Sequence, residues 1–231
     1  LELKEAICKK FHRDNKIIYN PNQIVVSTGA KQSIANVVQA LIKPGEEVIL
    51  LAPFWVSYSA IVLMADGIPK ILKSDISNDF KVSAKQIYDA ISENTKMIII
   101  NSPNNPSGSI YNKKELNEIA SVVKKYPNVF VLSDEIYEHI NYGTEHVSFA
   151  SIEGMYDRTI TVNGIAKAFA MTGWRIGYLG APIWIAKACT KLQGQVTSGA
   201  NCIAQRATIE AVTESPEKIN YMVKEFEQRR N

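Results

Sequence analysis

The sequence has little of what several protein classes require. Its net charge is only +3 over 231 residues, and its basic residues are scattered, which argues against a nucleic-acid or membrane-surface partner. No uninterrupted apolar stretch is long enough to span a bilayer. Internal repeats, low-complexity segments and Gly/Ser linkers are missing too. What remains is an ordinary globular composition, 46% hydrophobic and 21% charged, with enough residues for one sizeable α/β core.

Cysteine is also scarce. Cys8, Cys189 and Cys202 show no Cys-x-x-Cys spacing and lie in helical or apolar contexts. We expect three reduced thiols, buried or half-buried, in a cytoplasmic protein, and we assign no metal site.

Short apolar segments alternate with helical patterns along the chain. The expected strands are Ile24–Ser27, Glu47–Leu51, Ile68–Lys73, Lys96–Asn101, Val129–Ser133, Thr159–Val162 and Arg175–Gly180. The expected helices are Leu1–Asp14, Lys31–Ile42, Val56–Ala65, Ser83–Ile91, Lys113–Lys125, Pro182–Gln195, Ala200–Thr213 and a last one from Pro216 onward. Helices between short apolar strands predict a mostly parallel, doubly wound sheet.

Lys167 is the first candidate for chemistry. Small residues such as Gly164, Ala166 and Ala168 surround it in the sequence, so a cofactor aldehyde could reach its amine. Arg175 follows eight residues later, and its guanidinium suits a phosphate. A lysine with a nearby phosphate anchor is what a pyridoxal phosphate (PLP) Schiff base requires, whereas an isolated lysine of this kind would be a solvated surface residue.

A second candidate segment joins the strand Ile24–Ser27 to a helix through a small-residue turn that contains Gly29 and Ala30. The N-terminus of that helix leaves backbone N–H groups free to bind an anion, and Lys31 adds positive charge. Taken alone this signal is weak, because many such turns bind nothing.

Two further candidates follow buried strands. Trp55 comes after the strand Glu47–Leu51 and a proline, and it could stack on a flat heteroaromatic ring or belong to the core. Asn105 lies in a turn-rich segment after a continuous apolar run, where open α/β sheets bind ligands, although an ordinary loop would look similar. We expect the Asn105–Pro106 peptide bond to be cis, since this segment must turn sharply.

The last candidates follow the strand Val129–Ser133. Asp134 could pair with a protonated pyridine nitrogen, or it could cap a following helix. Tyr137 could hydrogen-bond a phenolic oxygen of the same ring. We interpret Glu135 as a structural or solvated carboxylate.

Together these segments resemble the class I aminotransferases of fold type I, the aspartate aminotransferase family. The resemblance rests on STGAKQ, APFWVSY, NSPNNPSG, SDEIYE and NGIAKAFAMTGWRIGY, which occur in the family's order over nearly the whole chain. It implies the PLP-transferase fold, a three-layer α/β/α large domain with a mostly parallel seven-stranded sheet.

The resemblance also implies a role for each candidate. Lys167 would form the Schiff base with PLP, Asp134 would contact the pyridine nitrogen, and Tyr137 would contact the phenolate oxygen. Trp55 would stack on the ring, and Trp55 and Asn105 would also contact substrate. The phosphate would be bound by Gly29, Ala30, Lys31 and Arg175. Many members carry Ser immediately before the lysine; Ala166 stands there in this chain, so one phosphate hydrogen bond is expected to be missing.

Family members are longer, so we expect a piece of a longer protein. Residues 1–214 would form the PLP-binding large domain without its N-terminal arm, and residues 215–231 would begin a long helix toward a C-terminal domain. The polar, small-residue segment Thr197–Asn201 would lie near the interface of a homodimer.

The activity implied by the resemblance is transamination between an amino acid, in first place aspartate, and a 2-oxo acid such as 2-oxoglutarate. A PLP-dependent β-lyase would share every residue named, and so would the PLP-sensing domain of a transcription regulator. The residues that separate these functions lie mainly on the substrate side of the site.

Overall fold

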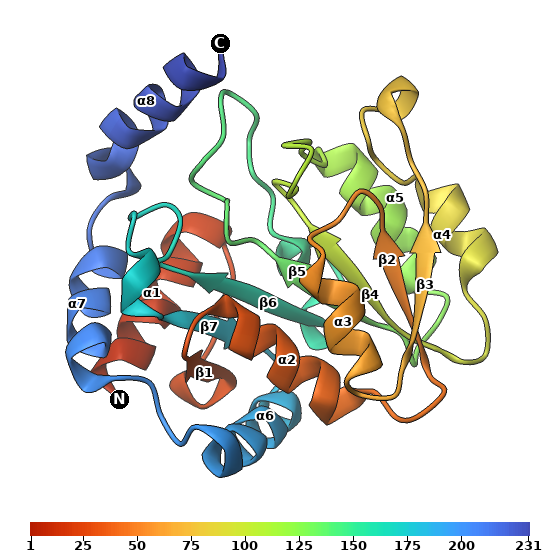
Figure 1. The fold of residues 1–231 in the computed structure, drawn as a ribbon, viewed down its shortest axis with the longest axis horizontal. Coiled ribbons are helices and arrows are strands. Elements are labelled where there is room, and N and C mark those ends of the chain that lie inside the picture. Colours follow the sequence, from red (N-terminus) through yellow and green to blue (C-terminus); the bar gives the residue numbers. More distant parts are fainter.

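A seven-stranded sheet forms the centre of the protein, whose computed structural model describes all residues from 1 to 231 (Figure 1). The strands are β1 (Ile24–Ser27), β2 (Glu47–Leu51), β3 (Ile68–Leu72), β4 (Thr95–Asn101), β5 (Phe130–Asp134), β6 (Thr159–Gly164) and β7 (Gly177–Gly180). Their spatial order is β1-β7-β6-β5-β4-β2-β3, and only β7 runs against its neighbours. The predicted seven-stranded, mostly parallel sheet is therefore confirmed.

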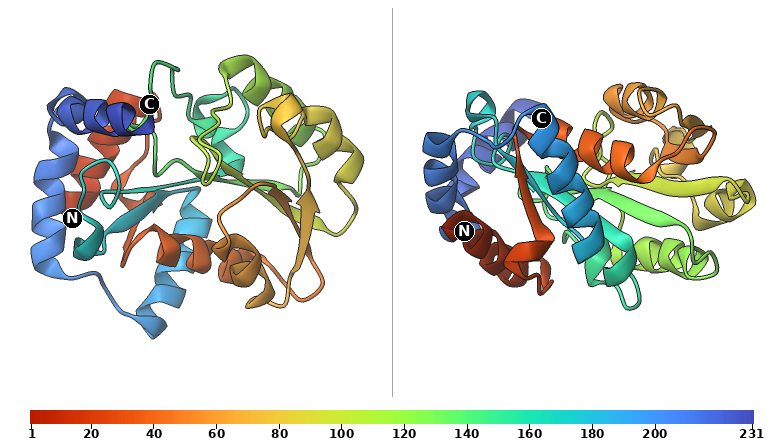
Figure 2. Two further views of the ribbon diagram at one scale, coloured as in Figure 1. Left: turned by 45° about the horizontal axis from the view of Figure 1, so that its top comes forward. Right: turned by 90° about the horizontal axis from the view of Figure 1, so that it is seen from below.

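Helices cover both faces of this sheet (Figure 2). They are α1 (Glu2–Asn15), α2 (Ala30–Leu41), α3 (Ser57–Leu63), α4 (Ala84–Ala90), α5 (Lys113–Val123), α6 (Ile183–Val196), α7 (Cys202–Thr213) and α8 (Asn220–Arg230). One face packs against α2, α3 and α6, and the other against α4 and α5 and, toward β1, against α1 with α7 beside it. This arrangement gives the expected three layers, α/β/α.

The central strands are apolar at consecutive positions because both of their faces are buried. In β2, Val48 and Leu50 belong to the core beneath α2 and α3, whereas Ile49 and Leu51 belong to the core beneath α4 and α5. Each Å² of apolar surface removed from water contributes about 25 cal/mol, so burial on both faces stabilises these strands.

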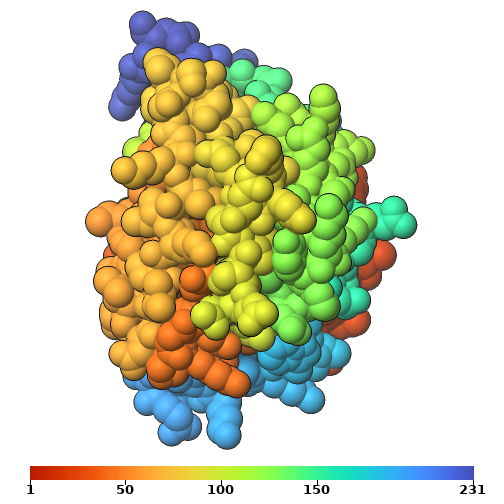
Figure 3. Space-filling model, turned by 90° about the vertical axis from the view of Figure 1, so that its right-hand side faces the viewer, coloured from red at the N-terminus to blue at the C-terminus, as the bar shows by residue number.

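The edge strand β3 is different, and Figure 3 views the side of the molecule on which it lies. Ile68 and Ile71 are half-exposed there. Pro69 lacks a backbone donor, and Lys70 forms an ion pair with Glu47 at 3.1 Å. A proline and a lysine on an edge strand discourage pairing with a further strand.

The predicted boundaries lie within two residues of the observed ones except at the last helix. The last helix begins as a 3₁₀ turn, Pro216–Ile219, before α8. Arg175 precedes β7 instead of opening it, because its φ of 54° is left-handed and ends any extended run. Cys202 is exposed, contrary to expectation, since α7 buries the face that carries Ala204 and Thr208.

α8 extends away from the sheet at the C-terminal end of the chain and buries none of its residues (Figure 1). No helix of the structure is both long enough and apolar enough to cross a membrane.

Candidate functional site

The predicted site residues meet in one cavity at the edge of the sheet where the parallel strands end. Its volume of ≈ 200 Å³ exceeds the ~30 Å³ share of one water several-fold, so it can take a small organic ligand. Its lining consists of Ala30, Lys31, Ile34, Trp55, Tyr58, Asn101, Asn105, Asp134, Ile136, Tyr137, Ala166, Lys167, Thr172 and Arg175. Eight of the nine predicted residues are in this set. The ninth, Gly29, is not part of the lining but lies next to the Arg175 guanidinium.

The reversed direction of β7 explains why the lysine and the arginine share this edge. β6 ends at Gly164, and β7 begins at Gly177 as its antiparallel neighbour, so the segment between them returns at the same edge. Lys167 lies just after β6, and Arg175 lies just before β7. Both therefore reach the edge at which β4 and β5 end.

Lys167 projects into the cavity from a tight turn. The turn is closed by a hydrogen bond from the Ala170 N–H to the Lys167 carbonyl at 3.0 Å. The Lys167 Nζ atom lies 5.8 Å from the centre of the Tyr137 ring. The side chain is exposed toward the cavity, which leaves its amine accessible to a carbonyl group.

Asp134 ends β5 and is buried, with 4% of its surface exposed. The Tyr58 hydroxyl of α3 donates to Oδ2 at 2.6 Å, and the Ile136 N–H donates to Oδ1 at 3.3 Å. Burial raises the pKa of Asp134 to about 6 in spite of these hydrogen bonds. Turns follow Asp134 rather than a helix, so the helix-cap alternative does not apply. A positively charged ligand atom would relieve the cost of this buried carboxylate.

A short hydrogen-bond chain positions the two polar groups beside Asp134. Asn101, at the end of β4, donates through Nδ2 to the Asp134 carbonyl at 2.9 Å. Its Oδ1 accepts from the Asn105 N–H at 2.7 Å, and Asn105 Nδ2 donates to the Tyr137 hydroxyl at 3.3 Å. The Asn105–Pro106 bond is cis, as predicted. Asn105 and Tyr137 can thus act on one ligand oxygen together.

An anion cradle forms where β1 meets α2. Gly29 has a φ of 88°, and the first N–H groups of α2, at Ala30 and Lys31, have no acceptor within the helix. A Cβ on Gly29 would lie 2.4 Å from Arg175 Nη2, so the guanidinium fills the space that glycine leaves. Two free N–H groups, the helix dipole and a fixed guanidinium suit a phosphate.

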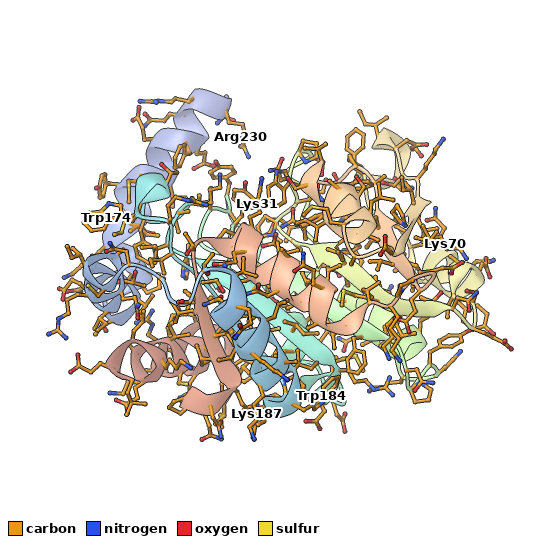
Figure 4. The ribbon with its side chains drawn as sticks, turned by 60° about the horizontal axis from the view of Figure 1, so that its bottom comes forward. Lys31, Lys70, Trp174, Trp184, Lys187 and Arg230 are labelled. Atoms are coloured by element: carbon orange, nitrogen blue, oxygen red, sulfur yellow. The ribbon has the colours of Figure 1, made fainter.

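The Lys31 side chain lies over the Trp55 ring, so Lys31 joins the anion cradle through its backbone N–H. Its Nζ atom lies 4.8 Å from the centre of the Trp55 ring, at the N-terminal end of α2 (Figure 4). Trp55 is half-buried and meets the Tyr58 ring edge-on at 5.5 Å. Trp55 therefore offers a flat wall to the cavity. Lys187 lies on α6, away from this edge of the sheet (Figure 4).

Glu135 has the structural role that its sequence context suggested. Ser133 and Ser148 donate to its Oε1 at 2.8 and 2.9 Å, and the Phe149 N–H donates to the same atom at 3.2 Å. His146 Nε2 lies 3.1 Å from Oε2. These partners fix the loop after β5 and place Glu135 outside the cavity lining.

The chemical groups that line the cavity fit PLP. It combines an accessible amine, a buried carboxylate, a flat aromatic wall and an anion cradle, which match an aldehyde, a pyridine nitrogen, a ring and a phosphate. Tyr58 and Asn101 also line the cavity and were not among the predicted site residues. Polar atoms at or near the ends of apolar strands were a usable signal for Asn101, but Tyr58 has no such signal.

The known proteins that resemble this chain are aminotransferases. The family model "Aminotransferase class I and II" matches residues 1–231. A Petunia hybrida protein described as a bifunctional aspartate aminotransferase and glutamate/aspartate-prephenate aminotransferase is 47% identical over 235 residues, covering 100% of this chain and 49% of its own length. A Pinus pinaster aspartate aminotransferase is also 47% identical, with 100% and 48% covered. The chain thus spans about half the length of these curated relatives.

Solved structures agree closely in fold. The aspartate aminotransferase from Rhizobium meliloti superposes with a TM-score of 0.97 at 41% identity, over 99% of this chain and 58% of that one. The Thermus thermophilus aspartate aminotransferase with maleate gives a TM-score of 0.94 at 40% identity, over 99% and 60%.

Proposed function

The chain belongs to the class I and II aminotransferases, and we propose that the protein containing it is a PLP-dependent aminotransferase that acts on aspartate or another small amino acid with 2-oxoglutarate. The observation that carries this proposal is the meeting of Lys167, Asp134 and the Arg175 cradle in one cavity. The relatives, described as aspartate and glutamate/aspartate-prephenate aminotransferases, support the activity and an acidic amino acid as substrate.

When bound, PLP supplies an aldehyde for the amine of the protein or substrate and a ring that withdraws electrons from the substrate's Cα. The cradle of Gly29, Ala30, Lys31 and Arg175 would bind its phosphate. Trp55 would stack on its ring and, with Asn105, contact substrate. These residues bind and orient; the remaining ones handle protons.

Lys167 would bind the cofactor covalently through Nζ and, once released by the incoming amino acid, accept the proton from the substrate's Cα at the same atom. Asp134 would hold a proton on the ring nitrogen through its carboxylate, which lies deep in the cavity. Tyr137 and Asn105 would hydrogen-bond the ring's phenolic oxygen. Lys167 would thus act at the substrate's Cα and Asp134 at the ring nitrogen, toward which the ring withdraws electrons from that carbon.

The organisation of the whole protein is also a proposal. We propose that residues 1–214 form the large domain and that residues 215–231 lead to a further domain, which is supported by α8, none of whose residues is buried. We also propose a homodimer, because Asn201, at the end of the segment Thr197–Asn201, and the exposed side chains of Trp174 and Ile203 line a surface pocket together with Arg175. Sedimentation at assay concentration tests the dimer, and a fully active monomer would contradict it.

Three free cysteines in a chain without disulfides support a cytoplasmic location, which we propose and which fractionation of source cells would test.

The activity is tested with the full-length protein by screening amino donors with 2-oxoglutarate. We expect transfer from aspartate, loss of the visible cofactor absorbance in Lys167→Ala, and attachment of PLP to Lys167 after borohydride reduction. Attachment to Lys31 or Lys187 instead would contradict the site. Release of ammonia without a 2-oxo acid would identify a β-lyase, and cofactor binding without turnover would favour a sensor domain.

A further inference from the structure

Glu138 lies behind the cavity, one residue after Tyr137, with 3% of its side chain exposed. Its carboxylate accepts donors from three segments of the chain. The Lys10 ammonium of α1 pairs with Oε1, Asn15 Nδ2 at the end of α1 donates to Oε2 at 2.6 Å, and Asn163 Nδ2 of β6 donates to Oε1 at 2.6 Å. Glu138 therefore joins α1, the turn after β5 and the end of β6.

Two of these segments carry residues of the proposed site. Asn163 precedes Lys167 by four positions, and its Oδ1 accepts from the Gly164 N–H at 2.7 Å, so its amide is fixed at both ends. On the other side, the His139 ring meets Phe169 edge-on at 6.3 Å, two residues beyond Lys167. The buried carboxylate of Glu138, which belongs to the turn that bears Tyr137, is thus hydrogen-bonded to the start of the loop that bears Lys167.

The charges around Glu138 keep it ionised. Burial raises the pKa of this carboxyl, but the charges of Lys10, His139 and His146 lower it by more, so that the pKa is about 2. His139 Nε2 lies 3.4 Å from Oε1 of Glu138 and 3.6 Å from Asp14. An ionised carboxylate can accept both amides and the ammonium at once.

Stability alone gives little reason for such a group. A buried ion pair is often no more stabilising than apolar residues of the same volume. What the carboxylate does provide, and apolar packing does not, is a set of directed hydrogen bonds to named atoms. Directed hydrogen bonds can fix the position of one segment of the site relative to another.

We propose that Glu138 is a positioning residue that, through the amide of Asn163, fixes the loop bearing Lys167 relative to Tyr137. The inference rests on the proposed function, because Lys167 and Tyr137 matter as partners of one cofactor. Glu138 itself is outside the cavity lining and acts through these neighbours.

The test compares Asn163→Ala with Asn15→Ala in the full-length protein. Both asparagines are buried, and each donates one amide to Glu138 at 2.6 Å, but only Asn163 leads to the lysine loop. We expect both variants to lose thermal stability to a similar degree. Only Asn163→Ala should lower kcat, on the order of tenfold with KM little changed, because small misplacements of a catalytic group are costly.

Two further readouts separate positioning from a structural role. Asn163→Ala should shift the pKa of the visible absorbance transition and speed amide hydrogen exchange of residues 164–171 in the cofactor-free protein, whereas Asn15→Ala should do neither. If Asn163→Ala fails to fold, Asn163→Ser, which removes less volume, takes its place. Equal effects of the two sites on kcat and exchange would overturn the proposal. If the wild type binds PLP but transfers no amino group, the proposed function fails while the exchange measurement still tests this inference.

Discussion

Replacing Tyr58 by Phe removes one hydroxyl from the most buried part of the proposed site and leaves the ring in place. That hydroxyl donates to Asp134 Oδ2 at 2.6 Å. A hydrogen bond to a charged group contributes about 1.5–3 kcal/mol. At about 1.4 kcal/mol per pKa unit, its loss should raise the pKa of Asp134 by about 1 to 2, above its present value of about 6.

The sign of the stability effect follows from proton binding. The pKa of folded Asp134 lies above its ordinary value of 3.8, so the folded protein holds this proton more tightly than the unfolded chain. The contribution of Asp134 to the free energy of unfolding therefore falls as pH rises from 3.8 through the folded pKa, and then stays constant. In Tyr58→Phe this fall should continue to a higher pH than in the wild type.

The assay is denaturant unfolding of the cofactor-free, full-length protein at fixed concentration, at about pH 5 and about pH 8.5. The destabilisation caused by Tyr58→Phe should be larger at the higher pH by about 1.4–2.7 kcal/mol, which is the energy equivalent of the expected pKa change. The matched control is Tyr111→Phe, because the buried Tyr111 hydroxyl bonds only the backbone of Val82. Equal destabilisation of Tyr58→Phe at both pH values would refute the reasoning.

Three further predictions concern PLP affinity, each measured as the dissociation constant of the cofactor. Gly29→Ala should weaken binding about tenfold or more, since the backbone at φ 88° and ψ 157° is strained by about 1–3 kcal/mol for a residue with a Cβ and the new atom displaces Arg175, whereas Gly194→Ala, with no atom nearby, should leave affinity unchanged. Ala166→Ser should tighten binding several-fold through one added hydrogen bond of about 1 kcal/mol; an unchanged affinity would mean that residue 166 does not face the phosphate. Trp55→Leu should weaken binding about fivefold through lost stacking of about 1 kcal/mol, and unaltered affinity would place the ring elsewhere.

The sheet could be predicted from sequence because its physical cause is local. Consecutive apolar residues such as Val48 and Ile49 occur only where a strand is buried on both faces, and helices between such strands leave few topologies. The exact end of a strand is less predictable. Arg175 was assigned to β7, but its backbone is left-handed and its guanidinium lies against Thr172 and Gly29, features that the sequence does not display.

The site divides in the same way. Residues that follow strands, such as Asp134 and Asn105, were found because the carboxyl ends of parallel strands share one edge. Tyr58 was missed because its hydroxyl matters only through a carboxylate 76 positions away. Glu138 was read as part of a motif without a role, since its partner Lys10 lies 128 positions earlier in the chain.

Three buried carboxylates within five residues show what distinguishes a site from a core. Glu135 accepts two hydroxyls and one backbone N–H on a single oxygen. Glu138 accepts an ammonium and two amides, and the charges of Lys10, His139 and His146 lower its pKa to about 2 although burial raises it. Asp134 receives one hydroxyl and one long backbone bond, and burial raises its pKa to about 6. The three are equally hidden from solvent, so burial does not separate them. What separates Asp134 is that no cation forms an ion pair with it, although Lys167 is near enough to lower its pKa, and that it faces a cavity. The positive ring nitrogen of the proposed cofactor would match a carboxylate in that position.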